Sequence, residues 1–219
     1  MAEEERPSIW VLAGTNGAGK SSVGGVFLRQ SGTDYYNPDE AARRISKANP
    51  ALSQHDANAL AWREGVRQLQ EAIRVRREHF FETTLGGNTI VGLLEEACRE
   101  GIAVRIWYAG LASVDLHIAR VAARVARGGH DIPEEDVRRR YVQSRLNLIR
   151  LLPHIAELQV YDNSGEAPSA TGVVPPPRLV LHWEGGKVRG PSPRQLSRTP
   201  DWAKPIVAAA LKLARVGTK

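Results

Sequence analysis

A glycine-rich segment, GTNGAGKSS, follows the short apolar run of residues 8–13 near the N-terminus. Four of its residues satisfy the pattern G-x-x-x-x-G-K-[ST], whose backbone amides wrap a phosphate group: Gly14, Gly19, Lys20 and Ser21. The apolar run is typical of a buried strand, and residues 19–30 are predicted to form a helix whose N-terminus adds positive potential. This strand–loop–helix unit restricts the chain to an α/β fold with a phosphate site at the end of a strand.

Short apolar runs and amphipathic segments alternate through the following 130 or so residues. Further strands are predicted at residues 33–37, 79–84, 102–111 and 157–164, and helices at 39–47, 55–77, 87–100, 114–127 and 134–152. This alternation predicts a three-layer sandwich of the P-loop NTPase type, with a mostly parallel five-stranded sheet and helices on both faces. One apolar face of the helix 55–77 is predicted to carry Trp62, Val66, Leu69 and Ile73.

The composition changes after residue 165. GEAPSATGVVPPP is predicted to be a linker, because three consecutive prolines cannot pair in a sheet ladder. RLVLHWEGGKVRG is predicted to be a hairpin, and residues 201–215 an amphipathic helix. We therefore expect one domain: a core of residues 1–165 with a lid at about 120–140, and a tail of residues 166–219 packed on that core.

The overall composition excludes several classes of protein. Cys98 is the only cysteine, which excludes an intramolecular disulfide and multi-cysteine metal clusters. The chain has neither a long uncharged apolar run nor an export signal, so we expect a cytoplasmic protein without a membrane partner. The net charge is +6, but the basic residues are spread over many helical segments, so we do not expect nucleic acid as a partner.

The glycine-rich loop predicts a site for ATP and Mg²⁺. Lys20 is expected to bridge the β- and γ-phosphates, and the Ser21 hydroxyl to ligate Mg²⁺. The candidate nucleotide-binding residues are Gly14, Thr15, Asn16, Gly17, Ala18, Gly19, Lys20, Ser21 and Ser22.

Two motifs that mark other phosphate-binding classes are absent: N-K-x-D, which reads guanine, and the L-S-G-G-Q signature of ABC-type ATPases. The small-kinase class remains, in which a carboxylate near the P-loop activates an acceptor hydroxyl. Asp39 lies 19 residues after Lys20, at the tip of a predicted strand. We expect it to be a general base that faces the phosphates, and the alternative is a helix cap beside Pro38.

A second carboxylate, Glu82, follows two phenylalanines at the tip of another predicted strand. Burial of a carboxylate there is costly unless a partner satisfies it. Glu82 is therefore predicted to join the Mg²⁺–water shell or to bind the acceptor, and the alternative is a carboxylate buried against an arginine. Thr83 and Thr84 are expected to donate hydrogen bonds to the acceptor or to cap the next helix.

Three arginines precede a glycine-rich break, GGHDIP. Arg120, Arg124 and Arg127 are spaced four and three residues apart, so they are predicted to share one helix face. We expect this lid to close over ATP and to bring guanidinium groups onto the transferred phosphoryl group. The alternative is a solvated basic face paired with the acidic residues at 134–136.

Several motifs in order resemble the short bacterial zeta-toxin-like P-loop proteins: GTNGAGKSS, NPDEAAR, FETTL, RVAARVARGGHDIPEEDVRRRY and YDNS. The resemblance covers roughly residues 8–165. It implies a kinase that moves the γ-phosphate of ATP to the 3′-hydroxyl of UDP-N-acetylglucosamine, and an antitoxin protein that blocks the ATP site.

The resemblance also assigns roles to residues. Lys20 and Ser21 match the Walker residues, Asp39 matches the catalytic aspartate, and either Arg120 or Arg124 matches the first lid arginine. Glu82 and Thr84 match a segment that contacts sugar and phosphates.

Three positions depart from the pattern. Gly86 stands where the larger toxins carry an arginine, and His130 stands where they have a second phosphate-contacting arginine, with Arg127 as a nearby substitute. Arg43, a candidate substrate-binding residue, is displaced by one position. The sequence therefore predicts a kinase of a small hydroxylated acceptor. The resemblance implies that this acceptor is a nucleotide sugar and that the protein is the toxin of a toxin–antitoxin pair. Two alternatives remain: a nucleotide-binding regulatory ATPase, or a polynucleotide or RNA kinase that binds nucleic acid through its basic surface.

Overall fold

The computed structural model describes residues 7–25, 35–129, 131–165 and 174–216. His130, the end of the helix predicted at 19–30 and most of the predicted linker lie outside the described residues. The strands are β1 (Ser8–Ala13), β2 (Tyr35–Tyr36), β3 (His79–Thr83), β4 (Ala103–Gly110), β5 (Glu157–Asp162), β6 (Arg178–Glu184) and β7 (Lys187–Gly190). The longer helices are α2 (Pro38–Ala48), α3 (Gln54–Arg74), α4 (Asn88–Arg99), α5 (Val114–Val125), α6 (Glu134–Leu151) and α7 (Lys204–Val216).

The seven strands within the described residues form one sheet, in the order β2-β3-β1-β4-β5-β6-β7. The first five strands in this order pair in parallel, and β6 and β7 add an antiparallel edge. The predicted fold class, a mostly parallel sheet packed with helices, is confirmed. The predicted hairpin, β6–β7, extends this same sheet.

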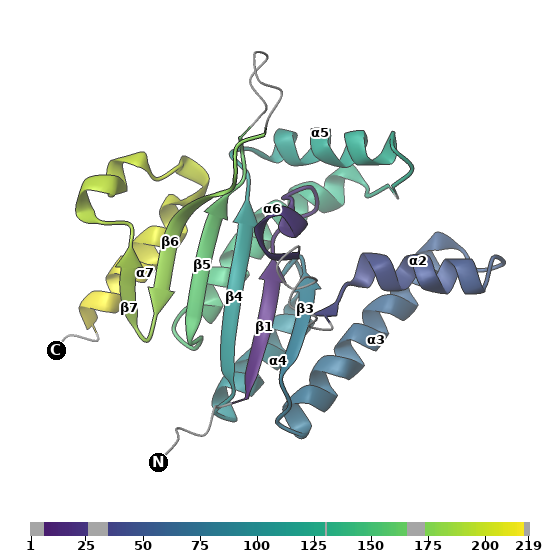
Figure 1. The fold of residues 1–219 in the computed structure, drawn as a ribbon, viewed down its shortest axis with the longest axis horizontal. Coiled ribbons are helices and arrows are strands. Elements are labelled where there is room, and N and C mark those ends of the chain that lie inside the picture. The colour runs from purple at the N-terminus through teal and green to yellow at the C-terminus, as the bar shows by residue number, and fades with distance from the viewer. Residues whose placement is uncertain (1–6, 26–34, 130, 166–173, 217–219) are drawn as a thin grey trace.

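The longer helices lie on one face of the sheet, beside one edge and across one end (Figure 1). α4, α6 and α7 lie behind the strands, α2 and α3 flank the edge formed by β2 and β3, and α5 lies across the ends of the strands where the arrowheads point. Buried side chains from the sheet and from α4, α6 and α7 form the core, among them Ile106, Leu148, Leu158 and Ile206. No helix of the described residues is long and apolar enough to cross a membrane.

The predicted apolar face of α3 is partly wrong. Leu69 and Ile73 are buried, but the side chain of Trp62 is 49% exposed. The core face of this helix is built instead around small residues such as Ala57 and Ala61, which allow close packing. Trp62 follows Ala61 by one position, about 100° around the helix, and this rotation turns its ring away from the core.

The carboxyl ends of the parallel strands gather the candidate site. The amide of Gly14, directly after β1, donates a hydrogen bond of 3.2 Å to the carbonyl of Thr83 at the end of β3. Leu12 on β1 lies in register with Glu82 on β3. Parallel pairing therefore brings two segments that are 70 residues apart in sequence to one edge of the sheet.

Candidate active site

The backbone of the P-loop passes so close to neighbouring atoms that two of its glycine positions have no room for a side chain. A Cβ at Gly14 would lie 2.3 Å from the carbonyl oxygen of Ala109, and a Cβ at Gly19 would lie 2.2 Å from Nδ2 of Asn163. Gly19 also has a φ of 74°, which side chains other than glycine rarely adopt. Ser21 begins a short helical turn, η1 (Ser21–Gly25), and its side chain is exposed. The loop thus has the tight backbone cradle that the motif predicts.

Lys20 turns back onto its own loop and onto β3. Its Nζ donates to the carbonyl of Gly14 at 2.9 Å and lies 3.5 Å from Oε1 of Glu82. The other carboxylate oxygen of Glu82 accepts a hydrogen bond from Nδ2 of Asn37 at 3.1 Å. The alternative interpretation, in which Glu82 is buried against an arginine, is therefore wrong, because its partners are Lys20 and Asn37.

Burial raises the pKa of Glu82, and the nearby Lys20 ammonium only partly opposes this rise. The side chain is 13% exposed. A carboxylate in this position is costly to the fold and is expected where function requires it.

Asp39 lies in the first turn of α2, but it does not cap that helix. Asn37 is the N-cap, and its Oδ1 accepts hydrogen bonds from the amides of Asp39 at 2.9 Å and Glu40 at 3.1 Å. The Asp39 side chain instead pairs with Arg124 on α5, with 3.3 Å between Oδ2 and Nη1. The interpretation of Asp39 as a helix cap is therefore wrong, because Asn37 has that role. Its role as a general base that faces the phosphates stays a prediction.

The other predicted lid arginines do not reach Asp39 in this structure. Nη2 of Arg120 donates to the carbonyl of Gly165 at 3.1 Å, next to the end of β5. Arg127 lies beyond the last residue of α5, is exposed, and donates to the carbonyl of Ala123 in its own helix. The three arginines therefore have three different partners. Glu134 pairs with Arg138, and Asp136 pairs with Arg139 and Arg140, so these ion pairs lie within α6.

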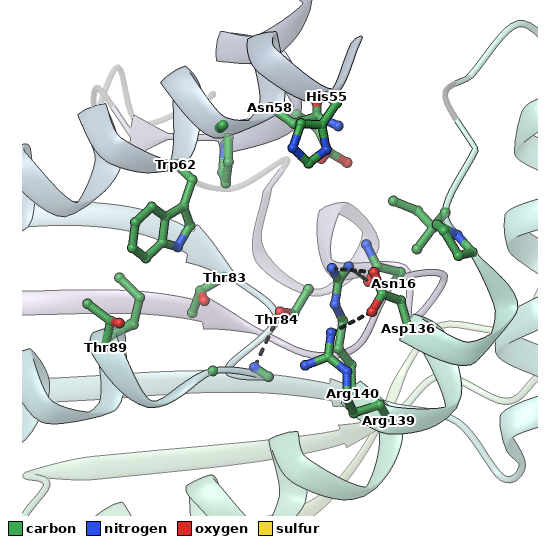
Figure 2. Close-up of a pocket in the computed structure, with 18 of the residues that line it drawn as sticks. Asn16, His55, Asn58, Trp62, Thr83, Thr84, Thr89, Asp136, Arg139 and Arg140 are labelled. Atoms are coloured by element: carbon green, nitrogen blue, oxygen red, sulfur yellow. Dashed lines mark hydrogen bonds and ion pairs between the residues drawn. The ribbon is translucent and has the colours of Figure 1, made fainter. Parts of the chain in front are cut away.

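A pocket of about 560 Å³ opens beside the P-loop (Figure 2). Its walls come from the P-loop, the start of α2, one side of α3, the loop between β3 and α4, and the start of α6. Asn16, Asp39, Thr83 and Thr84 are among the predicted site residues that line it. Arg43 and Glu82, the other two predicted substrate-binding residues, are not part of the lining; Arg43 is exposed on α2, and Glu82 is paired with Lys20.

Both threonines of FETTL also shape the loop that follows them. Oγ1 of Thr83 accepts from the amide of Leu85 at 3.1 Å, and Oγ1 of Thr84 accepts from the amide of Gly86 at 3.3 Å. Leu85 is fully buried with a φ of 51°, a left-handed conformation that is strained for a leucine. Nδ2 of the buried Asn147 donates to the carbonyl of Leu85 at 2.8 Å and holds this conformation in place.

Three residues that brace the P-loop were not predicted from the sequence. Nδ1 of the buried His117 is 2.8 Å from the carbonyl oxygen of Asn16, and Nδ2 of Asn163 donates to the carbonyl of Ala18 at 2.8 Å. Because the carbonyl can only accept, His117 carries its proton on Nδ1. Burial lowers the pKa of His117 to about 4, so the ring stays neutral near pH 7.

Arg140 on α6 is the third of these residues. Its Nη1 donates to Oδ1 of Asn16 at 2.9 Å, and its Nη2 lies 3.2 Å from Oδ2 of Asp136. A Cβ at Gly86 would lie 2.7 Å from Cγ of Arg140, so the arginine packs over the glycine that departs from the toxin pattern. Helical spacing was the available signal, since Arg140 is three residues after the buried Val137 and four before the buried Ser144.

Comparison with other proteins places the chain in a family. No protein-family model matches the sequence. A Haemophilus influenzae protein described only as uncharacterized is 33% identical over 143 residues, which make up 62% of this chain and 99% of that protein. The chain belongs to the same family as this protein.

Solved structures show which fold this family has. A chain of the AvrRxo1-ORF1:AvrRxo1-ORF2 complex with sulphate ions matches with a TM-score of 0.64 at 14% identity, over 90% of this chain and 64% of that chain. A structure of the same complex with ATP matches with a TM-score of 0.63, again over 64% of the other chain. A chain of the PezAT chromosomal toxin–antitoxin system of Streptococcus pneumoniae matches with a TM-score of 0.52 at 13% identity, over 72% of this chain and 68% of that chain. The chain therefore shares the fold of these proteins, which agrees with the P-loop fold that the motifs predicted.

Proposed function

We propose that this protein is an ATP-dependent phosphotransferase that moves the γ-phosphate to a hydroxyl group of a small acceptor. One observation carries the proposal: the P-loop, the Lys20–Glu82 pair and the Asp39 carboxylate meet at one edge of the sheet, beside a pocket that Asn16 and Asp39 both line. A nucleotide site and a candidate base on the same pocket are the two parts that a small kinase needs.

The residues present fit a phosphate group and its metal ion. The amides of the P-loop form the cradle, and a Lys20 ammonium released from Gly14 and Glu82 would hold the β- and γ-phosphates. The Ser21 hydroxyl and the Glu82 carboxylate would hold Mg²⁺, directly or through water, and the ion would offset charge on the phosphates. Mg²⁺ usually binds through one or two protein oxygens together with substrate phosphates, so a dedicated cage of side chains is not required.

The acceptor would lie in the pocket with its hydroxyl toward Asp39. Asp39 Oδ2 takes the hydroxyl proton as the new oxygen–phosphorus bond forms and the bond to the leaving ADP breaks. The Arg124 side chain, which is ion-paired with Asp39 in this structure, would move so that its guanidinium binds the phosphoryl oxygens. Arg140 keeps Asn16 and the P-loop in position. The chain contributes positioning and charge, and it forms no covalent intermediate.

The experiment that tests the proposal incubates the protein with Mg²⁺-ATP and a metabolite panel that includes UDP-N-acetylglucosamine, and detects a gain of one phosphate by mass spectrometry. Asp39→Asn removes the proposed base and should lower transfer by about 10²–10⁴-fold. Asp115→Asn is the matched control, because the Asp115 side chain is 77% exposed and pairs with Arg138 on the outer surface. ATP turnover without a modified acceptor, equal in all three proteins, would overturn the proposal.

Two finer parts of the proposal rest on the resemblance and on similar structures. UDP-N-acetylglucosamine is the acceptor that the zeta-toxin-like motifs imply, and PezAT, whose fold is similar, is a toxin–antitoxin system. We therefore extend the proposal to a toxin role with an antitoxin partner at the ATP site. Growth arrest on expression of the wild-type chain and none with Asp39→Asn would support this role, and equal growth would contradict it.

A further inference from the structure

The pocket extends well beyond the residues that would handle phosphate. In Figure 2, Asn16, Asp136 and Arg140 lie at one end, and Trp62 and Thr89 lie at the other. The charged end adjoins the P-loop through the Arg140–Asn16 hydrogen bond. The far end consists of one side of α3 and the start of α4, and the proposed phosphate chemistry uses neither.

Trp62 is the one tryptophan of the chain that is strongly exposed. Its side chain is 49% exposed, whereas Trp183 and Trp202 are 4% and 3% exposed and the remaining two are partly buried. Its ring points from α3 into the pocket, toward the side on which Thr83 and Thr89 lie (Figure 2). Exposure of the largest apolar side chain is costly in water, and within a pocket it provides a flat surface on which a ligand can pack.

Polar and apolar groups surround this ring on the pocket wall. Asn58 lies one helical turn before Trp62 on α3, so its amide borders the same space. Ile90 and Thr89 line the opposite wall from the first turn of α4. An apolar floor with a few polar groups at its border is the usual composition of a site for a ring-shaped ligand.

We propose that Trp62 is the stacking platform of an acceptor subsite, and that the acceptor of this enzyme carries a ring whose face packs on the indole while Asn58 and Thr89 bind polar groups on the ring's border. This inference rests on the proposed function, because it names the class of acceptor for the same pocket. The ring would lie at the far end of the pocket and the reacting hydroxyl near Asp39. A pocket of about 560 Å³ is larger than a three- or four-carbon acceptor requires.

The test measures binding without turnover. Ligand-observed NMR would determine the dissociation constants of uridine, adenosine and N-acetylglucosamine, with glycerol as a polyol without a ring. Trp62→Ala should weaken ring probes by at least about fivefold, since stacking on an aromatic side chain contributes at least that much. Trp62→Phe, which keeps a ring face, should restore most of the loss.

Leu60→Ala is the matched control for the alanine variant. Leu60 is also a large apolar residue of α3 with 39% exposure, but it does not line the pocket. Binding of the nucleosides would identify a base as the ring, and binding of N-acetylglucosamine would identify a sugar. If all three ring probes fail to bind at millimolar concentration, or if Trp62→Ala binds them as well as Leu60→Ala does, the inference is overturned.

Failure of the ring subsite can be distinguished from failure of the proposed kinase activity. The ring probes are offered without ATP, so their binding reports on the Trp62 end of the pocket and does not depend on phosphoryl transfer. If no acceptor is ever phosphorylated but ring probes still bind in a Trp62-dependent manner, the kinase proposal fails and the ring subsite stands.

Discussion

Nη1 of Arg124 lies 3.3 Å from Oδ2 of Asp39, so an arginine of α5 is ion-paired with the carboxylate that we propose as the base. The two side chains are 36% and 33% exposed, so water screens the pair and it adds little to stability. The pair instead connects α5 to the start of α2 across the candidate site. To stabilise a transferred phosphoryl group, Arg124 has to exchange this carboxylate for phosphate oxygens.

Arg124→Ala should therefore reduce catalysis far more than stability. Loss of an arginine that contacts the transferred phosphoryl group lowers kcat by about 10³-fold or more, whereas loss of a screened ion pair should leave the melting temperature nearly unchanged. Steady-state kinetics and thermal unfolding of the same preparations check both parts. Arg138→Ala is the control, because Arg138 pairs with Glu134 and Asp115 on the surface of α5 and α6. Equal kcat values for the two variants would contradict the role of Arg124.

Glu82→Gln should lower activity and raise stability. Burial raises the pKa of Glu82, so the native protein binds this proton more tightly than the unfolded chain does. The free energy of unfolding of the wild type therefore falls as the pH rises above the ordinary carboxyl value of 4.5, while the glutamine variant lacks this loss. The melting temperature of Glu82→Gln relative to wild type should increase between pH 4.5 and pH 8, and phosphoryl transfer should fall by about 10²-fold.

Glu157→Gln provides the control for that experiment. Glu157 is also a largely buried carboxylate, but it pairs with Arg105 at 2.8 Å. It is the first residue of β5, so it lies at the opposite end of the parallel strands from the P-loop. Its neutralisation should spare activity and should not stabilise the protein. A fall in stability of Glu82→Gln at pH 8 would show that the Lys20 pair outweighs the cost of burial.

The sequence predicted the parts of the site that depend on strand order. A buried strand followed by a P-loop implies a parallel sheet, and parallel strands end at one edge. The positions of Asp39 and Glu82 after two other predicted strands were therefore enough to expect both near the P-loop; in the structure Glu82 lies 3.5 Å from Lys20, and Asp39 lines the adjoining pocket. The elements themselves were also predictable, because turns, prolines and apolar periodicity mark their ends.

The parts that the sequence did not predict depend on how helices pack on the sheet. The sequence pattern places Trp62 on an apolar face of α3. In the structure, Ala57 and Ala61 are on the buried face of the helix, and the indole of Trp62 lines the pocket. Arg140 stands in a run of three arginines, and its contact with Asn16 spans 124 residues. Spacing within a helix indicates which residues share one face, but it does not identify a partner that is distant in the sequence.

Arg140→Ala should weaken ATP binding. The Arg140 side chain is 26% exposed and holds Asn16 Oδ1, and its removal leaves both Asn16 and Asp136 without that partner. Loss of the hydrogen bond between the charged Arg140 guanidinium and the P-loop residue Asn16 predicts a rise of about tenfold in the Kd of ATP, measured by calorimetry. Arg150→Ala is the matched variant, because Arg150 lies on the same helix, is 53% exposed and pairs with Glu95 at the surface. Similar ATP affinity in both variants would exclude Arg140 as a brace of the loop.

His117→Asn should change how stability depends on pH. Burial lowers the pKa of His117 to about 4, whereas the unfolded chain has the ordinary value of 6.5. Between these values the unfolded state binds a proton that the native state does not, so His117 lowers the free energy of unfolding by up to about 3 kcal/mol as the pH falls from 6.5 to 4.

An asparagine amide can still donate to Asn16 but does not titrate, so the wild type should lose its stability advantage over the variant between pH 8 and pH 5. Urea unfolding at both pH values measures this difference, with the exposed His154→Asn as the comparison, and parallel behaviour of the two variants would contradict the burial of a neutral His117 against the P-loop.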